Sequence, residues 1–160
     1  MRFSLIDRVA ALEPGRRIEA VKTVSLAEEY LADHFPQAPV LPGVLMLEGL
    51  VQASAWLVRA SDNFAHSMVL LKEARGVKYA QFVEPGQTLK ISAEIAGRDG
   101  AETKLKAQAE VDGALAVSGR LVLRSYNCAD ADPAQAEIDN YIVARLRELF
   151  RVLHRPAQAA

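Results

Sequence analysis

The sequence feature that most constrains the fold is one apolar segment, Val44 to Arg59, which reads VLMLEGLVQASAWLVR. Its residues are good helix formers, and they place apolar side chains on every side of the predicted helix. A helix without a polar face has to be surrounded by protein. The segment is shorter than the roughly 20 residues of a membrane span and carries Glu48 and Gln52, so we do not expect it to cross a bilayer. It predicts a central, buried helix.

Strand patterns lie on both sides of this helix. Before it, the segments 5–12 and 17–24 flank a Pro14-Gly15 turn signal and predict a hairpin. After it, four further strands are predicted, two pairs of them joined at Asp-Gly, a strong hairpin signal. They are Met68 to Phe82, Thr88 to Ala96, Thr103 to Val111 and Leu115 to Leu123. A hairpin, a buried helix and an antiparallel meander predict an α+β domain in which a curled sheet wraps one helix.

The segment from Ser25 to Gly43 differs from its neighbours because it contains prolines at 36, 39 and 42. Proline lacks the backbone N–H and has a fixed φ, so a regular helix or a central strand is not expected here. We expect a rigid loop that can hold a side chain in place.

The C-terminal part forms a separate pattern. Pro133 follows an aspartate and is expected at the start of a helix. An apolar stripe then follows helical spacing; its members are Ile138, Ile142, Leu146, Leu149 and Leu153. Since charges of both signs flank the stripe, we expect it to pack against protein rather than lie on a membrane. We therefore divide the chain into a domain of residues 1–127 and a linker with a helical extension, residues 128–160.

Composition and charge exclude several classes of protein. Hydrophobic residues make up 51% and charged residues 24% of the 160, an ordinary globular balance that argues against disorder. Nineteen basic and twenty acidic residues give a formal net charge of −1, so nucleic acid is not an expected partner. The charged N-terminal residues do not resemble a secretory signal, and Cys128 is the only cysteine. We expect a cytoplasmic protein.

Glu48 and His34 are the candidate reacting groups. Glu48 is the only carboxylic acid of the predicted central helix, and burying a carboxylate is costly unless it is hydrogen-bonded or protonated. Gln52 lies four residues further on the same helical face and can orient it. His34 stands in the proline-rich loop before the helix, and histidine accepts protons near pH 7. Taken singly, the glutamate could reach the surface or pair with a cation, and the histidine could serve packing.

The run from Asp33 to Ala53, DHFPQAPVLPGVLMLEGLVQA, closely resembles the active-site signature of 3-hydroxyacyl-acyl carrier protein (ACP) dehydratases of type II fatty acid synthesis. That signature runs roughly G-H-F-P-G-x-P-x-x-P-G-V-x-x-x-E-A-x-A-Q, and its spacing of fourteen residues from His to Glu is the same here. Weaker similarity in the segments 6–9, 20–25 and 82–87 extends the resemblance over most of residues 5–124. The C-terminal helix lies outside it.

The resemblance implies a hot-dog fold and a homodimer or dimer-based oligomer with active sites shared between subunits. It implies that His34 removes a proton from C2 of a (3R)-3-hydroxyacyl-ACP while Glu48 of the other subunit, directly or through water, protonates the departing hydroxyl, giving trans-2-enoyl-ACP. The Gly43 N–H would polarise the thioester carbonyl, the Val40 carbonyl would orient the imidazole, and Gln52 would hold Glu48. No metal and no cofactor is expected besides the phosphopantetheine arm of ACP.

Two residues depart from the signature, and alternatives remain open. Gln37 stands where the family usually has glycine, and Gly49 replaces the usual alanine, which allows closer packing of the helix or a differently shaped acyl tunnel. A hot-dog acyl thioesterase would need a carboxylate but no histidine in this loop. A non-catalytic acyl- or lipid-binding module would keep the fold alone.

Lys72, Arg75 and Lys78 are candidate contacts for the acidic ACP, although strand cations of this kind are more often simply solvated.

Overall fold

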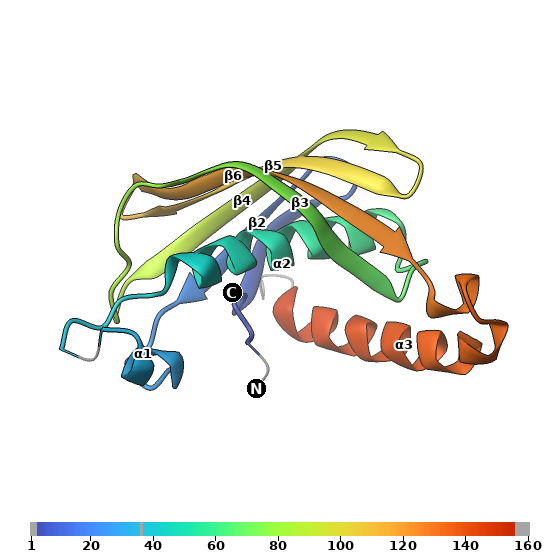
Figure 1. The fold of residues 1–160 in the computed structure, drawn as a ribbon, viewed down its shortest axis with the longest axis horizontal. Coiled ribbons are helices and arrows are strands. Elements are labelled where there is room, and N and C mark those ends of the chain that lie inside the picture. The colour runs from blue at the N-terminus through green and yellow to red at the C-terminus, as the bar shows by residue number, and fades with distance from the viewer. Residues whose placement is uncertain (1–2, 36, 156–160) are drawn as a thin grey trace, which may run out of the picture.

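A computed structural model of the chain describes residues 3–35 and 37–155. Figure 1 shows an antiparallel sheet, a long helix beneath it and a second long helix below that. The strands are β1 (Arg8–Glu13), β2 (Arg17–Thr23), β3 (Met68–Tyr79), β4 (Thr88–Asp99), β5 (Glu102–Val111) and β6 (Ala114–Tyr126). The helices are α1 (Tyr30–Asp33), α2 (Gly43–Ser61) and α3 (Ala136–Leu153), with short 3-10 turns η1 (Cys128–Asp130) and η2 (Pro133–Gln135).

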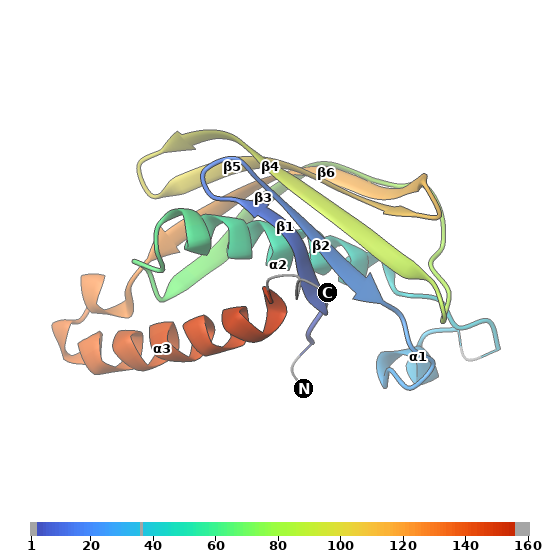
Figure 2. The same ribbon diagram turned by 180° about the vertical axis from the view of Figure 1, so that it is seen from behind.

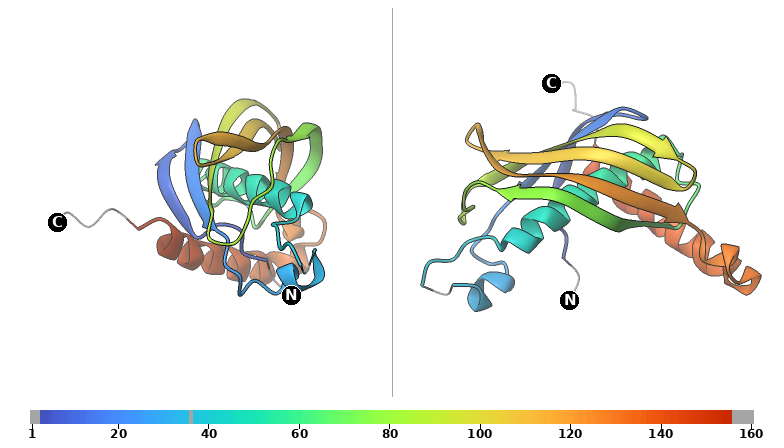
Figure 3. Two further views of the ribbon diagram at one scale, coloured as in Figure 1. Left: turned by 90° about the vertical axis from the view of Figure 1, so that its left-hand side faces the viewer. Right: turned by 45° about the horizontal axis from the view of Figure 1, so that its top comes forward.

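The six strands form one sheet in the order β1-β2-β4-β5-β6-β3, and all paired strands are antiparallel. The sheet curls around α2, as the end-on view in Figure 3 shows. Its two edges are β1 and β3, and β3 is twice as long as β1, with 12 residues against 6. The prediction of an α+β domain with a curled sheet around a central helix is confirmed.

The core lies between α2 and the concave face of the sheet. Leu50 and Leu57 of α2 have no exposed surface. They belong to one buried cluster with Ile18 of β2, Ile91 of β4 and Leu121 of β6. Each fully buried side chain of this size contributes about 1.5–3 kcal/mol through the hydrophobic effect. The apolar face that α2 needs to bury is therefore covered by the sheet on one side.

Gly49 lets α2 approach the sheet closely. A Cβ at this position would lie 3.3 Å from Cδ1 of Ile91, closer than most side-chain contacts. A glycine in a helix costs about 1 kcal/mol in helix propensity. The absence of a side chain here lets α2 lie close to Ile91 of β4, so closer packing, one of the two expected consequences of Gly49, is found.

Several boundaries differ from the sequence prediction: β1 begins at Arg8 rather than at residue 5, and β4 and β6 continue to Asp99 and Tyr126. The strand expected to run to Phe82 ends at Tyr79, because residues 80–87 form the irregular connection to β4. The segment Ser25–Gly43 contains one helical turn, α1, although no regular helix was expected in it. This turn ends at Asp33, three residues before the first proline, so the prolines are not in conflict with it.

The C-terminal helix α3 lies on the side of α2 away from the sheet (Figure 2). Phe150 packs against Trp56 and Phe64, with ring centroids 5.6 and 5.4 Å apart, and Leu153 is buried. At the other end, the buried carboxylate of Asp139 accepts hydrogen bonds from several groups. The donors are Ser67 Oγ and the N–H groups of Cys128 and Ala129.

This packing corrects one part of the predicted stripe. Leu146 and Leu153 face the core as expected, but Ile138 is 51% exposed and Leu149 is 37% exposed. The face that packs instead includes Val143 and Phe150. The helix is thus rotated from the orientation that apolar spacing alone predicts, and the hydrogen bonds of Asp139 tie its N-terminal end in this position. Across residues 3–35 and 37–155, no helix is long and apolar enough to cross a membrane.

Candidate active site

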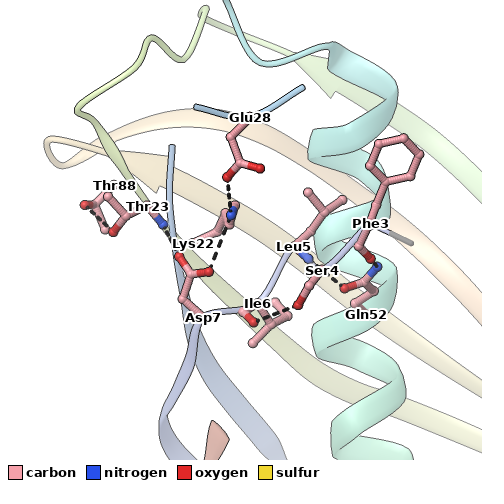
Figure 4. A network of polar contacts seen from close by, with 10 residues as sticks. All are labelled: Phe3, Ser4, Leu5, Ile6, Asp7, Lys22, Thr23, Glu28, Gln52 and Thr88. Carbon is pink, nitrogen blue, oxygen red and sulfur yellow. Dashed lines mark hydrogen bonds and ion pairs between the residues drawn. The ribbon is translucent and has the colours of Figure 1, made fainter. Parts of the chain in front are cut away.

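His34 directly follows α1 in the proline-rich loop, and several contacts fix that loop. Before it, the Nζ of buried Lys22 lies 2.6 Å from the carboxylate of Glu28 (Figure 4). After it, the N–H of Leu41 donates to the carbonyl of Val83 at 2.8 Å. The segment that carries His34 is thus tied to β2 on one side and to the β3–β4 connection on the other.

Phe35 gives the loop its sharp turn next to His34. Its φ is +51°, a left-handed conformation that is uncommon for an aromatic residue. Its carbonyl accepts the N–H of Ala38 at 2.8 Å, and its ring lies edge-on to the imidazole of His34 with centroids 4.6 Å apart. Backbone strain of this kind persists only where surrounding contacts enforce it and is often found at functional sites.

His34 lines a pocket of about 320 Å³ at the N-terminal end of α2. Val40, Gly43 and Met46 contribute to its wall, together with Tyr79 from the end of β3. The first N–H groups of a helix have no partner within it and carry the positive end of the helix dipole. The Gly43 N–H is one of these groups, so the pocket that contains the imidazole also offers a site for a partially negative oxygen.

Gly43 has a steric reason to be glycine. A Cβ here would lie 3.2 Å from Cε1 of Tyr79, so the aromatic ring rests directly against the start of α2. Val40, whose carbonyl was expected to orient the imidazole, lines the same pocket as His34. Within residues 3–35 and 37–155 no hydrogen bond joins His34 and Val40, and that role of Val40 remains a prediction.

Glu48 lies one and a half turns further along α2 and is half-buried. Gln52 Nε2 donates to Glu48 Oε1 at 3.0 Å, as the shared helical face predicted. Gln52 is itself fixed, because Nε2 also donates to the Phe3 carbonyl and Oε1 accepts the N–H of Leu5, both at 3.0 Å (Figure 4). The N-terminal segment therefore holds the amide, and the amide holds one carboxylate oxygen.

Glu48 opens onto a different depression from His34. This groove, about 480 Å³ in volume, runs along α2 between α3 and the start of β3. Its lining is mostly apolar and includes Val51, Trp56, Leu70 and Leu71. Within one chain, the proposed acid and base thus line separate pockets. His34, Val40 and Gly43 are brought together in one, and Glu48 and Gln52 in the other.

Among residues 3–35 and 37–155, Arg59 is the one cation that lines the groove of Glu48. Its guanidinium lies 5.4 Å from the Trp56 ring centroid and donates to the Val69 carbonyl at 3.4 Å. Its Nε is buried without a hydrogen-bond partner among the described residues. Burial lowers the pKa of Arg59 to about 10, since desolvation disfavours the charged form.

Sequence reasoning did not identify Tyr79 or Arg59 as part of these pockets. Tyr79 is the last residue of β3 and belongs to no sequence motif. Only the arrangement of the folded sheet brings it next to Gly43. Arg59 lies eleven residues after Glu48 on the same face of α2, and this spacing is a signal that was available. Among residues 3–35 and 37–155, no cluster of three or more His, Cys, Asp or Glu side chains could hold a metal ion.

The family model described as the FabA-like domain matches residues 1–120. A 3-hydroxyacyl-(acyl-carrier-protein) dehydratase, FabZ of Myxococcus xanthus, is 37% identical over 136 residues, covering 84% of this chain and 88% of the relative. The FabZ of Albidiferax ferrireducens is 42% identical over 122 residues, covering 74% of this chain and 81% of the relative.

A solved structure has the same fold. The dehydratase heterocomplex ApeI:P from Xenorhabdus doucetiae superposes with a TM-score of 0.66 at 22% identity, covering 83% of this chain and 90% of the other. At this identity the likeness shows the hot-dog fold alone. Because the family model covers residues 1–120 and relatives above 30% identity cover most of both chains, the chain belongs to the FabA-like family.

Proposed function

We propose that this protein dehydrates (3R)-3-hydroxyacyl-ACP to trans-2-enoyl-ACP in type II fatty acid or related acyl-chain synthesis. The observation that carries the proposal is the fixed carboxyl group of Glu48, held by Gln52 at the head of a mostly apolar groove. Two relatives of this protein are named as 3-hydroxyacyl-ACP dehydratases, and their names support the same reaction. The reaction makes this protein a hydro-lyase.

His34 and Glu48 divide the proton transfers. The neutral imidazole of His34 takes the C2 proton, which the thioester carbonyl acidifies, and the Gly43 N–H stabilises the negative charge that develops on the carbonyl oxygen. Glu48, in its protonated form, donates to the 3-hydroxyl, and the C3–O bond breaks to release water. The electron pair from the C2–H bond forms the double bond. Exchange of protons with solvent then restores both side chains.

The edge strand β3 supports a site shared between two subunits. Leu70 and Leu71, near its start, line the groove of Glu48, whereas Tyr79 at its end lines the pocket of His34. Among the residues that the structure describes, no strand pairs with its outer edge, and all three side chains are at least 40% exposed. A long exposed edge of this kind is suited to pairing with another strand.

Antiparallel pairing of β3 with the same strand of a second copy would reverse its direction. The Leu70 end of one strand would then meet the Tyr79 end of the other. Glu48 of one subunit would face His34 of the partner subunit, and the two-fold axis would generate two such sites. A homodimer, or a larger oligomer built from it, is therefore part of the proposal.

ACP is the proposed partner, since it presents the acyl group on its phosphopantetheine arm. Two of the three candidate cations on β3 have local partners: Lys72 pairs with Glu102 and Arg75 pairs with Glu73. Exposed ion pairs of this kind contribute little to stability and can exchange partners. Both cations therefore remain able to contact an acidic protein. We place the reaction in the cytoplasm, which suits a chain with a single cysteine.

The proposed reaction is tested by incubating the protein with 3-hydroxyacyl-ACP and following two signals in parallel. Enoyl absorbance reports dehydration, and free thiol reports hydrolysis of the thioester. We expect enoyl product without released thiol. Thiol release without enoyl product would identify a thioesterase, and binding with neither signal would identify an acyl-binding module.

A further inference from the structure

The groove of Glu48 continues well beyond the reacting carboxyl group. Glu48, Gln52, Ala55 and Arg59 all line it, and their spacing of four, three and four residues places them along one face of α2. At 1.5 Å per residue, the eleven residues from Glu48 to Arg59 span about 16 Å. The groove is therefore long enough to hold an extended hydrocarbon chain whose thioester lies near Glu48.

One wall of this groove comes from α3. Leu146, Leu149 and Leu153 line it opposite α2 and the start of β3. These residues lie beyond residues 1–120, the part of the chain that the FabA-like family model matches. The apolar area that a long acyl group would contact is thus supplied partly by a segment outside the family domain.

The far end of the groove is polar. Arg59 lies over Trp56 and reaches the Val69 carbonyl, so its guanidinium stands across the direction in which a chain from Glu48 would extend. An apolar chain end that met this group would have to desolvate it further, which is unfavourable. A polar boundary of this kind limits the length of the acyl chain. The leucines of α3 favour chains that fill the apolar space before this boundary.

We propose that α3 forms the distal wall of the acyl-binding groove, and that Leu146, Leu149 and Leu153 select for long 3-hydroxyacyl chains that reach them. The inference rests on the proposed dehydration and names the part of the substrate that the C-terminal helix recognises. A short acyl group would react at His34 and Glu48 without touching α3.

The test uses the full-length protein and two substrates, 3-hydroxybutyryl-ACP and 3-hydroxymyristoyl-ACP. Leu149→Trp narrows the groove, and Leu149→Phe narrows it less. Leu149 is 37% exposed, so a larger ring can be accommodated without overpacking the core. Val152→Trp is the matched control, because Val152 lies on the same helix, is 56% exposed and does not line this groove.

We expect Leu149→Trp to lower the long-to-short ratio of kcat/KM at least tenfold, roughly the effect of losing the burial of two methylene groups. Leu149→Phe should give a smaller decrease. Val152→Trp should leave the ratio within about twofold, since it adds no bulk to the groove. Circular dichroism and Tm establish that each variant is folded.

Three results would overturn the inference. The ratio could stay unchanged in folded Leu149→Trp, Val152→Trp could lower it equally, or both substrates could lose the same factor. In each of these cases dehydration itself persists, so the proposed function stands. A wild-type protein that dehydrates neither substrate would instead overturn the proposed function, and the inference with it.

Discussion

The two long helices have nearly the same length, 19 residues in α2 and 18 in α3, but they are packed in opposite ways. Ten residues of α2 are buried, whereas only Asp139 and Leu153 are buried in α3. The sheet covers α2 along its length. By contrast, α3 is held near its two ends, by the Asp139 hydrogen bonds and by the aromatic cluster around Phe150.

The difference indicates two kinds of contribution to one enzyme. In α2, the hydrogen bond from Gln52 holds Glu48 and Gly43 lies against Tyr79, so this helix supplies the groups whose positions the proposed mechanism depends on. In α3, the partly exposed leucines provide a surface rather than a reacting group. Changes in α2 should therefore affect the chemistry, and changes in α3 should affect stability and substrate range.

The largest expected effect is on the reacting pair. His34→Ala and Glu48→Ala should each lower turnover by at least ~100-fold, the usual scale for losing a positioned acid or base. Turnover of 3-hydroxyacyl-ACP measures the loss, and circular dichroism shows whether the fold persists. His66→Ala is the control, because His66 lines neither pocket and should leave turnover unchanged. Near-normal turnover in folded His34→Ala would contradict the mechanism.

Removing residues 130–160 should mainly lower stability. The deletion exposes the faces of Trp56 and Phe64 that Phe150 covers and removes buried Leu153. Two apolar side chains of this size correspond to about 4 kcal/mol, which is roughly a 10 °C decrease in Tm for a chain of this length. Calorimetry measures the decrease, and sedimentation tests whether the dimer remains.

Dehydration of 3-hydroxybutyryl-ACP should survive this deletion below the new Tm. Loss of that activity in a truncated protein that remains a folded dimer would place α3 in the reacting centre. It would also show that dividing the chain near residue 128 separates parts that work together.

Replacing one leucine in each helix should show the difference in packing as a difference in the free energy of unfolding. Leu57→Ala in α2 should lower the free energy of unfolding by about 3 kcal/mol, because Leu57 has no exposed surface and a cavity results. Leu149→Ala in α3 should lower it by less than about 1 kcal/mol, since that side chain is 37% exposed. Denaturant unfolding measures both, and equal losses would mean that α3 is packed as tightly as α2.

Most of the fold followed from local signals. The Pro14-Gly15 and Asp-Gly turns predicted the hairpins, and an apolar segment without a polar face predicted the buried helix. Gln52 could be placed beside Glu48 because a helix brings residues four apart onto one face. These features depend on residues close in sequence, so periodicity and turn chemistry were sufficient.

What could not be predicted depends on contacts between distant segments. Asp139 ties α3 to Ser67, Cys128 and Ala129, and hydrophobic periodicity gives no weight to a buried aspartate of this kind. Similarly, Tyr79 reaches Gly43 only because β3 lies at the sheet edge beside the start of α2.

The smallest expected effect concerns the anchor of α3. Hydrogen bonds from Ser67 and from the amides of Ala129 and Cys128 hold the pKa of Asp139 below its ordinary value. A lowered folded-state pKa stabilises the protein above the ordinary pKa of aspartate, and the contribution is lost as the pH falls through the lowered value. Asp139→Asn should lower Tm by a few degrees at pH 7. The difference from wild type should shrink below about pH 4, near the ordinary pKa of aspartate. A difference that does not change between pH 7 and pH 3 would show that charge plays no part in the anchor.

The central claim is that Glu48 of one subunit works with His34 of the partner subunit, and mixing inactive variants tests it most directly. His34→Ala and Glu48→Ala proteins are combined, subunit exchange is demonstrated by mass spectrometry, and turnover is measured. Random exchange makes half of the dimers mixed, and each mixed dimer contains one intact site, so activity should return to about a quarter of wild type. Recovery near that level supports the shared site. No recovery after complete exchange would mean that each site is built within one subunit or that these residues do not form the reacting pair.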